Sequence, residues 1–443
     1  MEQDNPDSAL EAKQGGDAAG GQPRTWWWAE ASIWTERMVS ALDNGVKGGK
    51  WFSLVDKAIR PATLEAAWRK VKRNKGAAGV DGQGIERFAA GAERYLAELH
   101  EDLKNDRYRP SPVKRIEIPK GGGQTRPLGI PTVKDRIVQT ALKMAIEPIF
   151  EVQFRAGSYG FRPGRSCKDA LREVDRLLKE GFTHVVDADL KSYFDTIPHD
   201  RLMAQVGERI SDGRILTLID GFLRQEIMTD MACWLPTTGT PQGAVLSPLL
   251  ANIYLHPLDL LMEQNGRRMV RYADDFVILC RTEDEAMAAL REVMAWTAAN
   301  GLTLHPDKTR IVNSQQPGQG FDFLGYRFEA GRRLVRKKSL TAIKDKVRAK
   351  TIRSRGDSLV RIIADLNPAL RGWFGYFKHA APFQLRSLDG FVRRRLRAIL
   401  RKQDKRPGPG RCKADHQRWP NAYFAARGLF TLETALEHAR HSR

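Results

Sequence analysis

Two adjacent aspartates interrupt an otherwise apolar stretch of the chain. The segment RYADDFVILC places Asp274 and Asp275 between two short pieces with the composition of strands. A second pair, Asp187 and Asp189, occurs in the segment HVVDADL. Because successive side chains of a strand point to opposite faces, these two carboxylates share one face, and the apolar residues between and around them can pack on the other. The sequence therefore predicts two carboxylate elements on one sheet.

Clustered carboxylates need a compensating charge. A group of three or four is costly unless a cation neutralises it. Oxygen ligands without a nearby histidine or thiolate favour Mg²⁺, with Mn²⁺ as the alternative, over zinc. Two such ions about 4 Å apart can stabilise the attacking and leaving oxygens of a phosphoryl transfer. One Asp-Asp pair alone is more simply a turn former, but two separate carboxylate elements favour a site for metal-dependent phosphoryl transfer.

Positive charge is concentrated in the last quarter of the chain. The 443 residues include 73 Lys and Arg against 53 Asp and Glu, a net charge of +20. Residues 332–443 hold 29 basic and 8 acidic residues (net +21), and residues 1–331 hold the remaining 44 and 45 (net −1). A solvated basic face explains most short charge runs. An imbalance across a whole domain indicates a polyanionic partner instead, and nucleic acid is the expected one.

Composition argues against several other classes of protein. The chain shows no run of 18 apolar residues and no signal peptide, so we expect no membrane span. The four cysteines are far apart and form no CxxC pair. This spacing argues against a zinc finger or a disulfide framework and fits a reducing cytoplasm.

Periodicity and loop signals divide the chain into four segments. Residues 1–25 are acidic and rich in Gly and Ala, which predicts a disordered lead-in. Residues 26–82 form an N-terminal extension that begins with a tryptophan-rich stretch, for which docking on the main body is favoured over base stacking. Residues 83–330 form the third segment. Between about 168 and 300 within it, helices alternate with short strands around one central hairpin, an α+β pattern. Residues 331–443 show helical periods throughout most of their length.

The two carboxylate elements resemble those of reverse transcriptases. RYADDFVIL is similar to the Tyr-x-Asp-Asp element of that family, and HVVDADLKSYFDTIPH to the other metal-binding strand of its palm. The resemblance implies that Asp189, Asp274 and Asp275 are the catalytic and metal-binding residues. It also makes Phe194, five residues after Asp189, the aromatic that excludes a ribose 2′-hydroxyl. Asp187 shares a face with Asp189 and remains the rival for the ligand role.

Further stretches match the same family in the expected order. TGTPQGAVLSPLL resembles the Pro-Gln-Gly element, which places Gln242 and Gly243 beside the incoming nucleotide. IPKGGGQTRPLGIP is similar to the fingers loop, in which Lys120 and Arg126 would bind the triphosphate. By the same resemblance Lys308 lies near the active site, where it could donate a proton to the leaving pyrophosphate.

SYGFRPGRSCKDAL resembles the element after the fingers and puts Arg162 and Arg165 near the template or the nucleotide. The implied architecture is a right-hand polymerase of α+β class. Its fingers and palm would occupy residues 83–330, and a basic α-helical thumb and maturase domain would occupy residues 331–443.

The C-terminal part resembles the thumb and maturase domain of group II intron proteins. The matching stretches are LNPALRGWFGYFKHA and LDGFVRRRLRAILRKQ, and VKRNKGAAGVDG resembles the N-terminal extension of the same family. Arginine-rich helices can bind structured RNA through its backbone. The expected RNA-binding residues are Arg371, Lys378, Arg393, Arg394, Arg395 and Arg397. The lack of a Cys/His-rich endonuclease segment resembles the compact bacterial class C members.

The resemblance implies an RNA-directed DNA polymerase that uses two Mg²⁺ ions. Its partners would be an intron RNA template, a DNA primer or target and dNTPs, in a ribonucleoprotein whose protein is a monomer or a dimer. It would also bind its intron RNA to assist splicing and mobility (retrohoming). We expect it in the bacterial cytoplasm, associated with the nucleoid when it acts on DNA.

Three alternatives stay open at this point. A non-enzymatic RNA-binding maturase would not need the intact carboxylates. A free-standing reverse transcriptase in host defence or repair would carry the same motifs, and only genomic context separates it. An RNA-dependent RNA polymerase needs room for a 2′-hydroxyl, which the bulky Phe194 argues against.

Overall fold

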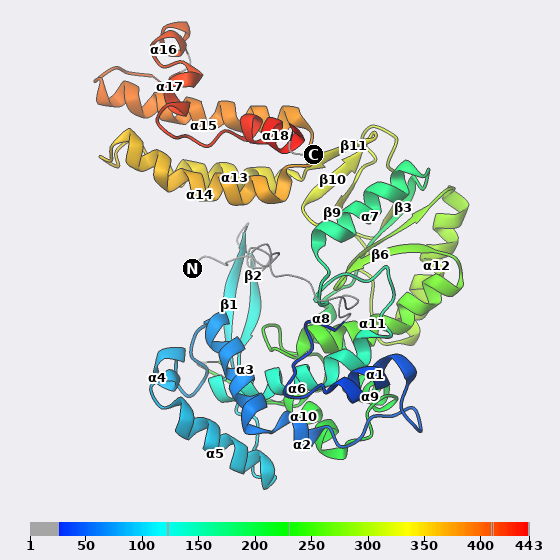
Figure 1. Cartoon of the computed structure of the whole chain (residues 1–443). Coiled ribbons are helices and arrows are strands. Elements are labelled where there is room, and N and C mark those ends of the chain that lie inside the picture. Colours follow the sequence, from blue (N-terminus) through cyan, green and yellow to red (C-terminus); the bar gives the residue numbers. More distant parts are fainter. Residues whose placement is uncertain (1–25, 122–123, 230, 409, 411, 442–443) are drawn as a thin grey trace, which may run out of the picture. The chain divides into compact units, whose positions relative to one another are not determined.

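The structure is a computed structural model that describes residues 26–121, 124–229, 231–408, 410 and 412–441 (Figure 1). The lead-in expected over residues 1–25 lies outside the described residues. The chain divides into two compact units. The first contains the described residues up to 173 together with 188–278 and 287–309, and the second contains 174–187, 279–286 and the residues from 310 onward.

Helices predominate before residue 300, with short strands between them, as the α+β pattern predicts. The helices of this part are α1 (Glu36–Asn44), α2 (Val55–Ala58), α3 (Pro61–Asn74), α4 (Ile85–Ala89), α5 (Ala92–Lys104), α6 (Val133–Glu151), α7 (Cys167–Lys179), α8 (Tyr193–Thr196), α9 (His199–Gly207), α10 (Gly213–Leu223), α11 (Ser247–Gln264) and α12 (Glu283–Ala299). The strands are β1 (Val113–Gly121), β2 (Gln124–Ile130), β3 (His184–Asp189), β4 (Ile227–Met228), β5 (Cys233–Trp234), β6 (Arg268–Tyr272) and β7 (Asp275–Cys280).

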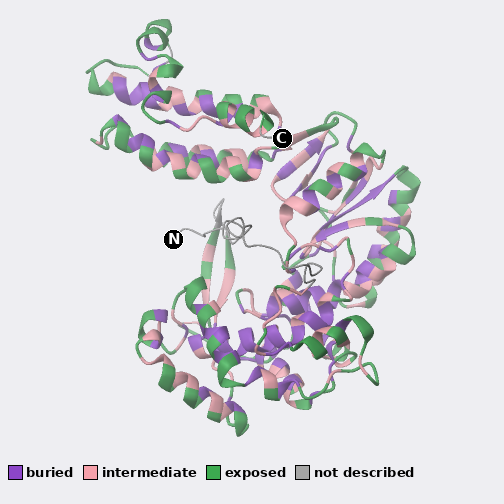
Figure 2. Cartoon of the chain, viewed as in Figure 1, coloured by how far each residue is buried: buried purple, intermediate pink, exposed green. Residues whose placement is uncertain are grey.

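Helix α6 is the central element of the first unit. It contacts α2, α3 and α11, and most of its side chains are buried (Figure 2). The Thr132 hydroxyl caps its N-terminus by accepting a hydrogen bond from the backbone N–H of Asp135 at 3.1 Å. The buried Asp135 carboxylate then accepts hydrogen bonds from the Tyr108 hydroxyl at 2.5 Å and from the Ser111 N–H at 3.2 Å. Burial raises the pKa of Asp135, and these hydrogen bonds lower it in part. The chain just before β1 is thereby fixed to α6.

The tryptophan-rich stretch docks on this unit through Trp34. That side chain is buried, and its indole N–H donates to the Met144 carbonyl of α6 at 2.9 Å. Its ring also meets Trp51 edge to face, with 5.3 Å between the ring centroids. The docking interpretation is confirmed for Trp34. Trp27, by contrast, is 63% exposed.

Two four-stranded sheets carry some of the predicted site residues. In one, the order is β2-β1-β4-β5, with β1 and β2 antiparallel and Ile118 opposite Arg126. In the other, the order is β6-β7-β3-β8, and β8 spans Arg310–Asn313. β3 is flanked by β7 and by β8, its antiparallel partner.

From residue 321 onward, the second unit contains a small antiparallel sheet and a group of helices. The sheet has the order β11-β10-β9, formed by β9 (Phe321–Phe323), β10 (Tyr326–Glu329) and β11 (Arg332–Val335). The helices are α13 (Lys337–Lys350), α14 (Leu359–Phe377), α15 (Pro382–Gln403), α16 (Lys413–Arg418), α17 (Asn421–Ala425) and α18 (Leu432–His441). Apolar residues of α13, α14, α15 and α18 form their core. Trp373 packs against this core, and Phe377 is buried. None of the described helices is long and apolar enough to cross a membrane.

Candidate active site and nucleic-acid interface

The two adjacent aspartates lie at a tight turn between β6 and β7. Ala273 and Asp274 form the turn, and Asp275 is the first residue of β7. Ala273 has φ +59°, in the left-handed region that costs a residue with a Cβ about 1–3 kcal/mol. Such a backbone conformation persists only where the surroundings fix it, so the contacts around Ala273 decide where the aspartates point.

A buried arginine provides those contacts. Arg271 is completely buried, and its guanidinium donates to the Ala273 carbonyl at 2.9 Å. It also forms two hydrogen bonds with the carboxylate of Asp259 on α11, at 2.7 and 2.5 Å. Burial alone lowers the pKa of Arg271, but the charge and hydrogen bonds of Asp259 more than offset this, so its pKa is raised. The guanidinium is therefore fully charged and joins the turn to α11.

The loop after α6 packs directly against the same turn. The backbone of Arg271 pairs with that of residues 157–159, and a Cβ added to Gly160 would lie 2.3 Å from the Ala273 nitrogen. The amide of Asn252 completes the network, since it donates to the Gly160 carbonyl at 2.8 Å and accepts from Arg271 at 2.9 Å. Glycine at position 160 lets two backbone segments touch where the aspartates emerge.

Removing the charge of Asp259 should strongly destabilise the first unit. Asp259→Asn leaves a buried guanidinium without its counter-charge, which costs about 3–5 kcal/mol in comparable buried pairs. We expect the denaturant midpoint, followed by tryptophan fluorescence, to fall accordingly. Asp220→Asn is the matched control, because Asp220 and Arg224 form a solvent-exposed pair and such pairs contribute little. An equal shift in both variants would show that the buried pair is not special.

The third predicted ligand, Asp189, ends β3 and pairs with the lysine that the sequence placed near it. The Lys308 ammonium lies 2.5 Å from Asp189 Oδ2, and the Asp189 carbonyl accepts from the His305 N–H at 2.7 Å. The rival residue Asp187 has a different partner, since Arg310 lies 3.2 Å from its carboxylate. Each carboxylate of this strand therefore has its own cation.

The carboxylate oxygens of Asp189, Asp274 and Asp275 are ligands that suit a hard divalent ion, but these side chains are not grouped around a common metal position. Across the described part of the chain, no three His, Cys, Asp or Glu side chains are grouped closely enough to hold a metal. Lys308 supplies the positive charge at Asp189 in this arrangement. Metal binding by Asp189 together with Asp274 and Asp275 would require Asp189 to exchange Lys308 for the ion.

The Pro-Gln-Gly element is held against β2 by backbone contacts. The Gly129 N–H donates to the Gln242 carbonyl at 2.6 Å. Gly243 has φ +108°, and a Cβ there would lie 2.4 Å from the Gly129 carbonyl oxygen. The Gln139 side chain of α6 accepts from the Val245 N–H at 2.8 Å and so fixes the following turn. Gln242 and Gly243 thus lie at a fixed position beside the β1–β2 hairpin.

A side chain at position 243 should displace this element. Gly243→Ala combines a disfavoured φ with a clash against backbone, a strain of about 1–3 kcal/mol. We expect kcat/KM for dNTP to fall by about tenfold or more in primer extension. Gly213→Ala is the control, because no atom lies within 4 Å of a Cβ at that position. Wild-type kcat/KM in Gly243→Ala would show that the close approach to Gly129 is not needed.

The remaining residues predicted to bind the nucleotide have fewer contacts that fix their position. Phe194 is half-buried in α8, and its carbonyl accepts from the Thr240 N–H at 2.6 Å, which joins it to the chain before Gln242. Burial raises the pKa of the next residue, Asp195, and the nearby Gln242 side chain lowers it in part. Arg126 is exposed on β2, whereas Lys120 lies in β1 with a side chain outside the described set.

Arg162 does not have the accessible position expected of it. Its side chain is buried, pairs with Glu151 at 2.7 Å and donates to the Ser158 carbonyl at 2.7 Å. A guanidinium with these partners stabilises the loop of residues 155–160 and does not face a template. Arg165 is half-buried and donates to the Ala156 carbonyl at 2.7 Å in the same loop.

Sequence reasoning missed the residues that hold the site together. These are Arg271, Asp259, Asn252, Gln139 and Gly160. One signal was present: Arg271 stands inside an apolar hairpin run, where a charged side chain needs a buried partner. Nothing in the sequence pointed to Asp259 as that partner.

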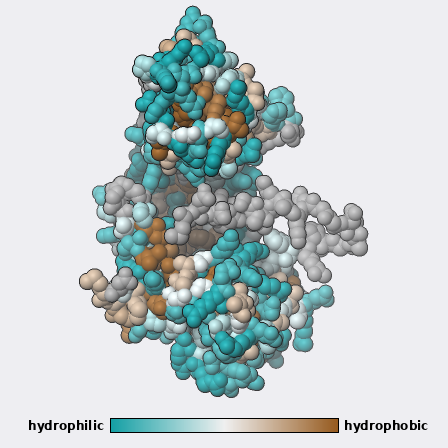
Figure 3. Space-filling view, turned by 90° about the vertical axis from the view of Figure 1, so that its left-hand side faces the viewer, coloured by the Kyte–Doolittle hydropathy of each residue, from teal (hydrophilic) through white to brown (hydrophobic). Residues whose placement is uncertain are grey.

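The six residues expected to bind RNA differ in accessibility. Arg371 is exposed, and Lys378, Arg393, Arg394 and Arg395 are half-buried. The guanidinium of Arg395 is bonded to Thr351. Hydrophilic residues cover most of the visible face of the C-terminal helices, with some hydrophobic residues among them (Figure 3).

Arg397 requires a correction. It is only 2% exposed, and its guanidinium donates to the Trp419 carbonyl at 2.9 Å and to Asn421 at 3.0 Å. Its side chain therefore stabilises the packing of α15 against the segment of residues 419–424. It is not accessible for a phosphate contact.

Two protein-family models match the chain. Residues 118–328 match the reverse transcriptase (RNA-dependent DNA polymerase) family. Residues 340–419 match the group II intron maturase-specific domain. The first range includes every predicted catalytic and nucleotide-binding residue, and the second includes the predicted RNA-binding residues.

Several curated proteins are similar to this chain. Protein YkfC of Escherichia coli is 36% identical over 321 residues, which cover 63% of this chain and 82% of that protein. The group II intron-encoded protein LtrA of Lactococcus lactis subsp. cremoris is 31% identical, with 60% of this chain and 55% of LtrA covered. An uncharacterised 91 kDa protein in the cob intron of Schizosaccharomyces pombe is 30% identical, with 56% and 38% covered. The chain thus spans most of the first relative and about half or less of the other two.

Proposed function

We propose that this chain, which belongs to the reverse transcriptase family and carries a group II intron maturase-specific domain, extends a DNA primer on an RNA template. The observation that carries the proposal is the placement of the aspartates. Asp275 begins β7 and Asp189 ends β3, and these strands are neighbours in one sheet. Asp274 lies in the turn that the buried Arg271 holds in place.

The carboxylates would bind the ions that such a reaction needs. Two Mg²⁺ ions held by Asp189, Asp274 and Asp275 would neutralise charge as the primer 3′-hydroxyl displaces pyrophosphate from a dNTP. Lys308, once released from Asp189, is available as a cation and proton donor beside the leaving group. The exposed Arg126 would bind the triphosphate, and Gln242 and Gly243 would position the nucleotide.

The C-terminal helices would supply the RNA-binding part of the function. Structured RNA is bound largely through its backbone, and the net charge of +21 over residues 332–443 suits such a partner. We propose that this unit binds the group II intron RNA, assists its splicing and holds it as template during intron mobility.

Primer extension tests the polymerase directly. With an RNA template, a DNA primer, dNTPs and Mg²⁺, we expect extension that stops when the metal is chelated. Asp274→Asn should lower the rate by at least about 10²-fold, because a carboxylate that stabilises transition-state charge is lost. Asp284→Asn on the exposed start of α12 is the matched control. Clean, RNA-binding protein that extends no primer would point to the maturase-only alternative.

Phe194 should set the choice of sugar. If its ring closes the space that a ribose 2′-hydroxyl would need, Phe194→Ala raises the use of NTPs relative to dNTPs by about tenfold or more. The ratio of kcat/KM values for the two nucleotides measures this. Phe52→Ala, which truncates a 68% exposed phenylalanine, should leave the ratio unchanged. The gate assignment fails if both variants keep the wild-type ratio.

A further inference from the structure

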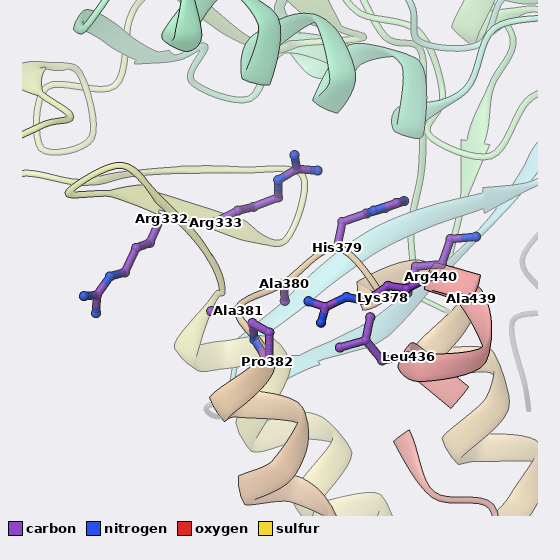
Figure 4. A pocket seen from close by; sticks show the side chains of 10 residues that line it. All are labelled: Arg332, Arg333, Lys378, His379, Ala380, Ala381, Pro382, Leu436, Ala439 and Arg440. Carbon is purple, nitrogen blue, oxygen red and sulfur yellow. The ribbon is translucent and has the colours of Figure 1, made fainter. Parts of the chain in front are cut away.

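A cavity of about 410 Å³ lies within the second unit, among elements that are far apart in sequence (Figure 4). The hairpin strand β11, the junction of α14 and α15, and the helix α18 line it. The lining residues are Arg332, Arg333, Lys378, His379, Ala380, Ala381, Pro382, Leu436, Ala439 and Arg440. Neither the active site nor the arginine-rich part of α15 contributes to it.

The charged side chains in the wall of this cavity are all basic. Of its ten described lining residues, four are Lys or Arg and none is acidic. Arg333 pairs with Asp175 at 2.7 Å, but its Nε atom is buried and has no hydrogen-bond partner among the described residues. Within the described chain, Arg332, Lys378 and Arg440 form no ion pair. The cavity thus presents donors and positive charge that the described residues do not satisfy.

The three walls are fixed to one another by hydrogen bonds. The Ala381 N–H donates to the Arg333 carbonyl at 2.8 Å, which joins the α14–α15 junction to β11. The buried Asp389 of α15 accepts from the N–H groups of Leu432 and Glu433, both at 3.0 Å, and so anchors the start of α18. The cavity is therefore a built feature of the unit, and a ligand would meet a preformed site.

Its size and lining match one nucleotide. A lone phosphate would occupy only a small part of 410 Å³, and sites for small organic groups begin at roughly 300 Å³. Pro382, Leu436 and the neighbouring alanines offer an apolar surface for a base, while Lys and Arg side chains offer charge-assisted hydrogen bonds to a phosphate. We infer that this pocket binds one nucleotide of an RNA strand, with its phosphate at Lys378 and Arg440. The inference rests on the RNA-binding function proposed above.

Binding of a short, fluorescently labelled single-stranded RNA to the full chain tests the inference. Measured by anisotropy, Arg440→Gln and Lys378→Gln should each bind about tenfold more weakly. Each should also show a smaller dependence of affinity on salt, because a phosphate contact is lost. Arg361→Gln removes the same charge from an exposed position on α14 outside the pocket and should change little.

A filling variant separates a pocket from general surface attraction. Ala439→Phe leaves the charge unchanged but occupies the cavity, and it should weaken RNA binding as strongly as Arg440→Gln does. Circular dichroism checks that α18 stays folded. Unchanged affinity in Ala439→Phe, or equal losses in Arg361→Gln and Arg440→Gln, would overturn the inference. Tighter binding of free 5′-AMP or of an acidic peptide than of RNA at this pocket would also overturn it.

Failure of this inference can be told apart from failure of the polymerase proposal. The binding assay needs neither dNTPs nor catalysis, so it can be read even if the wild type extends no primer. Conversely, a wild type that extends a primer while Arg440→Gln and Ala439→Phe bind RNA as tightly as the wild type does would overturn the pocket assignment and leave the polymerase proposal standing.

Discussion

The geometry of the proposed active site depends on one buried ion pair. Arg271 and Asp259 are both buried, and the guanidinium that Asp259 neutralises also binds the carbonyl of Ala273. Without Asp259 the guanidinium could not stay in the interior, since an unpaired buried charge costs several kcal/mol. Without the guanidinium, the strained turn at Ala273 would lose the contact that fixes it. The β6–β7 hairpin, α11 and the loop around Gly160 therefore meet at a point set by electrostatics as much as by apolar packing.

The two carboxylates of β3 are neutralised in ways that suit different roles. Arg310 contacts Asp187 through two guanidinium nitrogens, and a planar guanidinium is pre-organised for lasting pairs. Lys308 reaches Asp189 with a single ammonium group at the end of a flexible side chain. The Lys308 side chain is 57% exposed. An exposed, strongly hydrated ammonium is the easier of the two to displace. This difference favours Asp189 over Asp187 as the carboxylate that can pass from a protein cation to a metal ion.

Much of the fold and part of the site could be predicted from the sequence, because they depend on local patterns. Alternation and turn residues located β3, the β6–β7 hairpin and the aspartates on them. Long-range partners could not be predicted. Asp259 is an ordinary acidic residue in a helix until the fold brings Arg271 to it. In the same way, Arg162 and a template-binding arginine look alike in sequence, and only the position of Glu151 shows that Arg162 is used internally. Spacing shows which residues share a face, but it does not show what that face contacts.

The arginines of the second unit show the same limit of sequence-based prediction. Their charge can be read from the sequence, but the groups that they contact cannot. Arg397 and Arg395 use their guanidinium groups on neutral acceptors, the carbonyl of Trp419 and the backbone and hydroxyl of Thr351. Their charge is not cancelled by these bonds, so they still add to the field that attracts a polyanion. They are poorly placed to touch a phosphate, because their donors are already bonded to the protein. Direct contacts are better supplied by cations that have no acceptor among the described residues, and Arg332, Lys378 and Arg440 at the pocket beside α18 are three of these. If this unit binds RNA as proposed, its net charge sets how strongly RNA is attracted, and the cations left unpaired by the described residues set where the RNA is held.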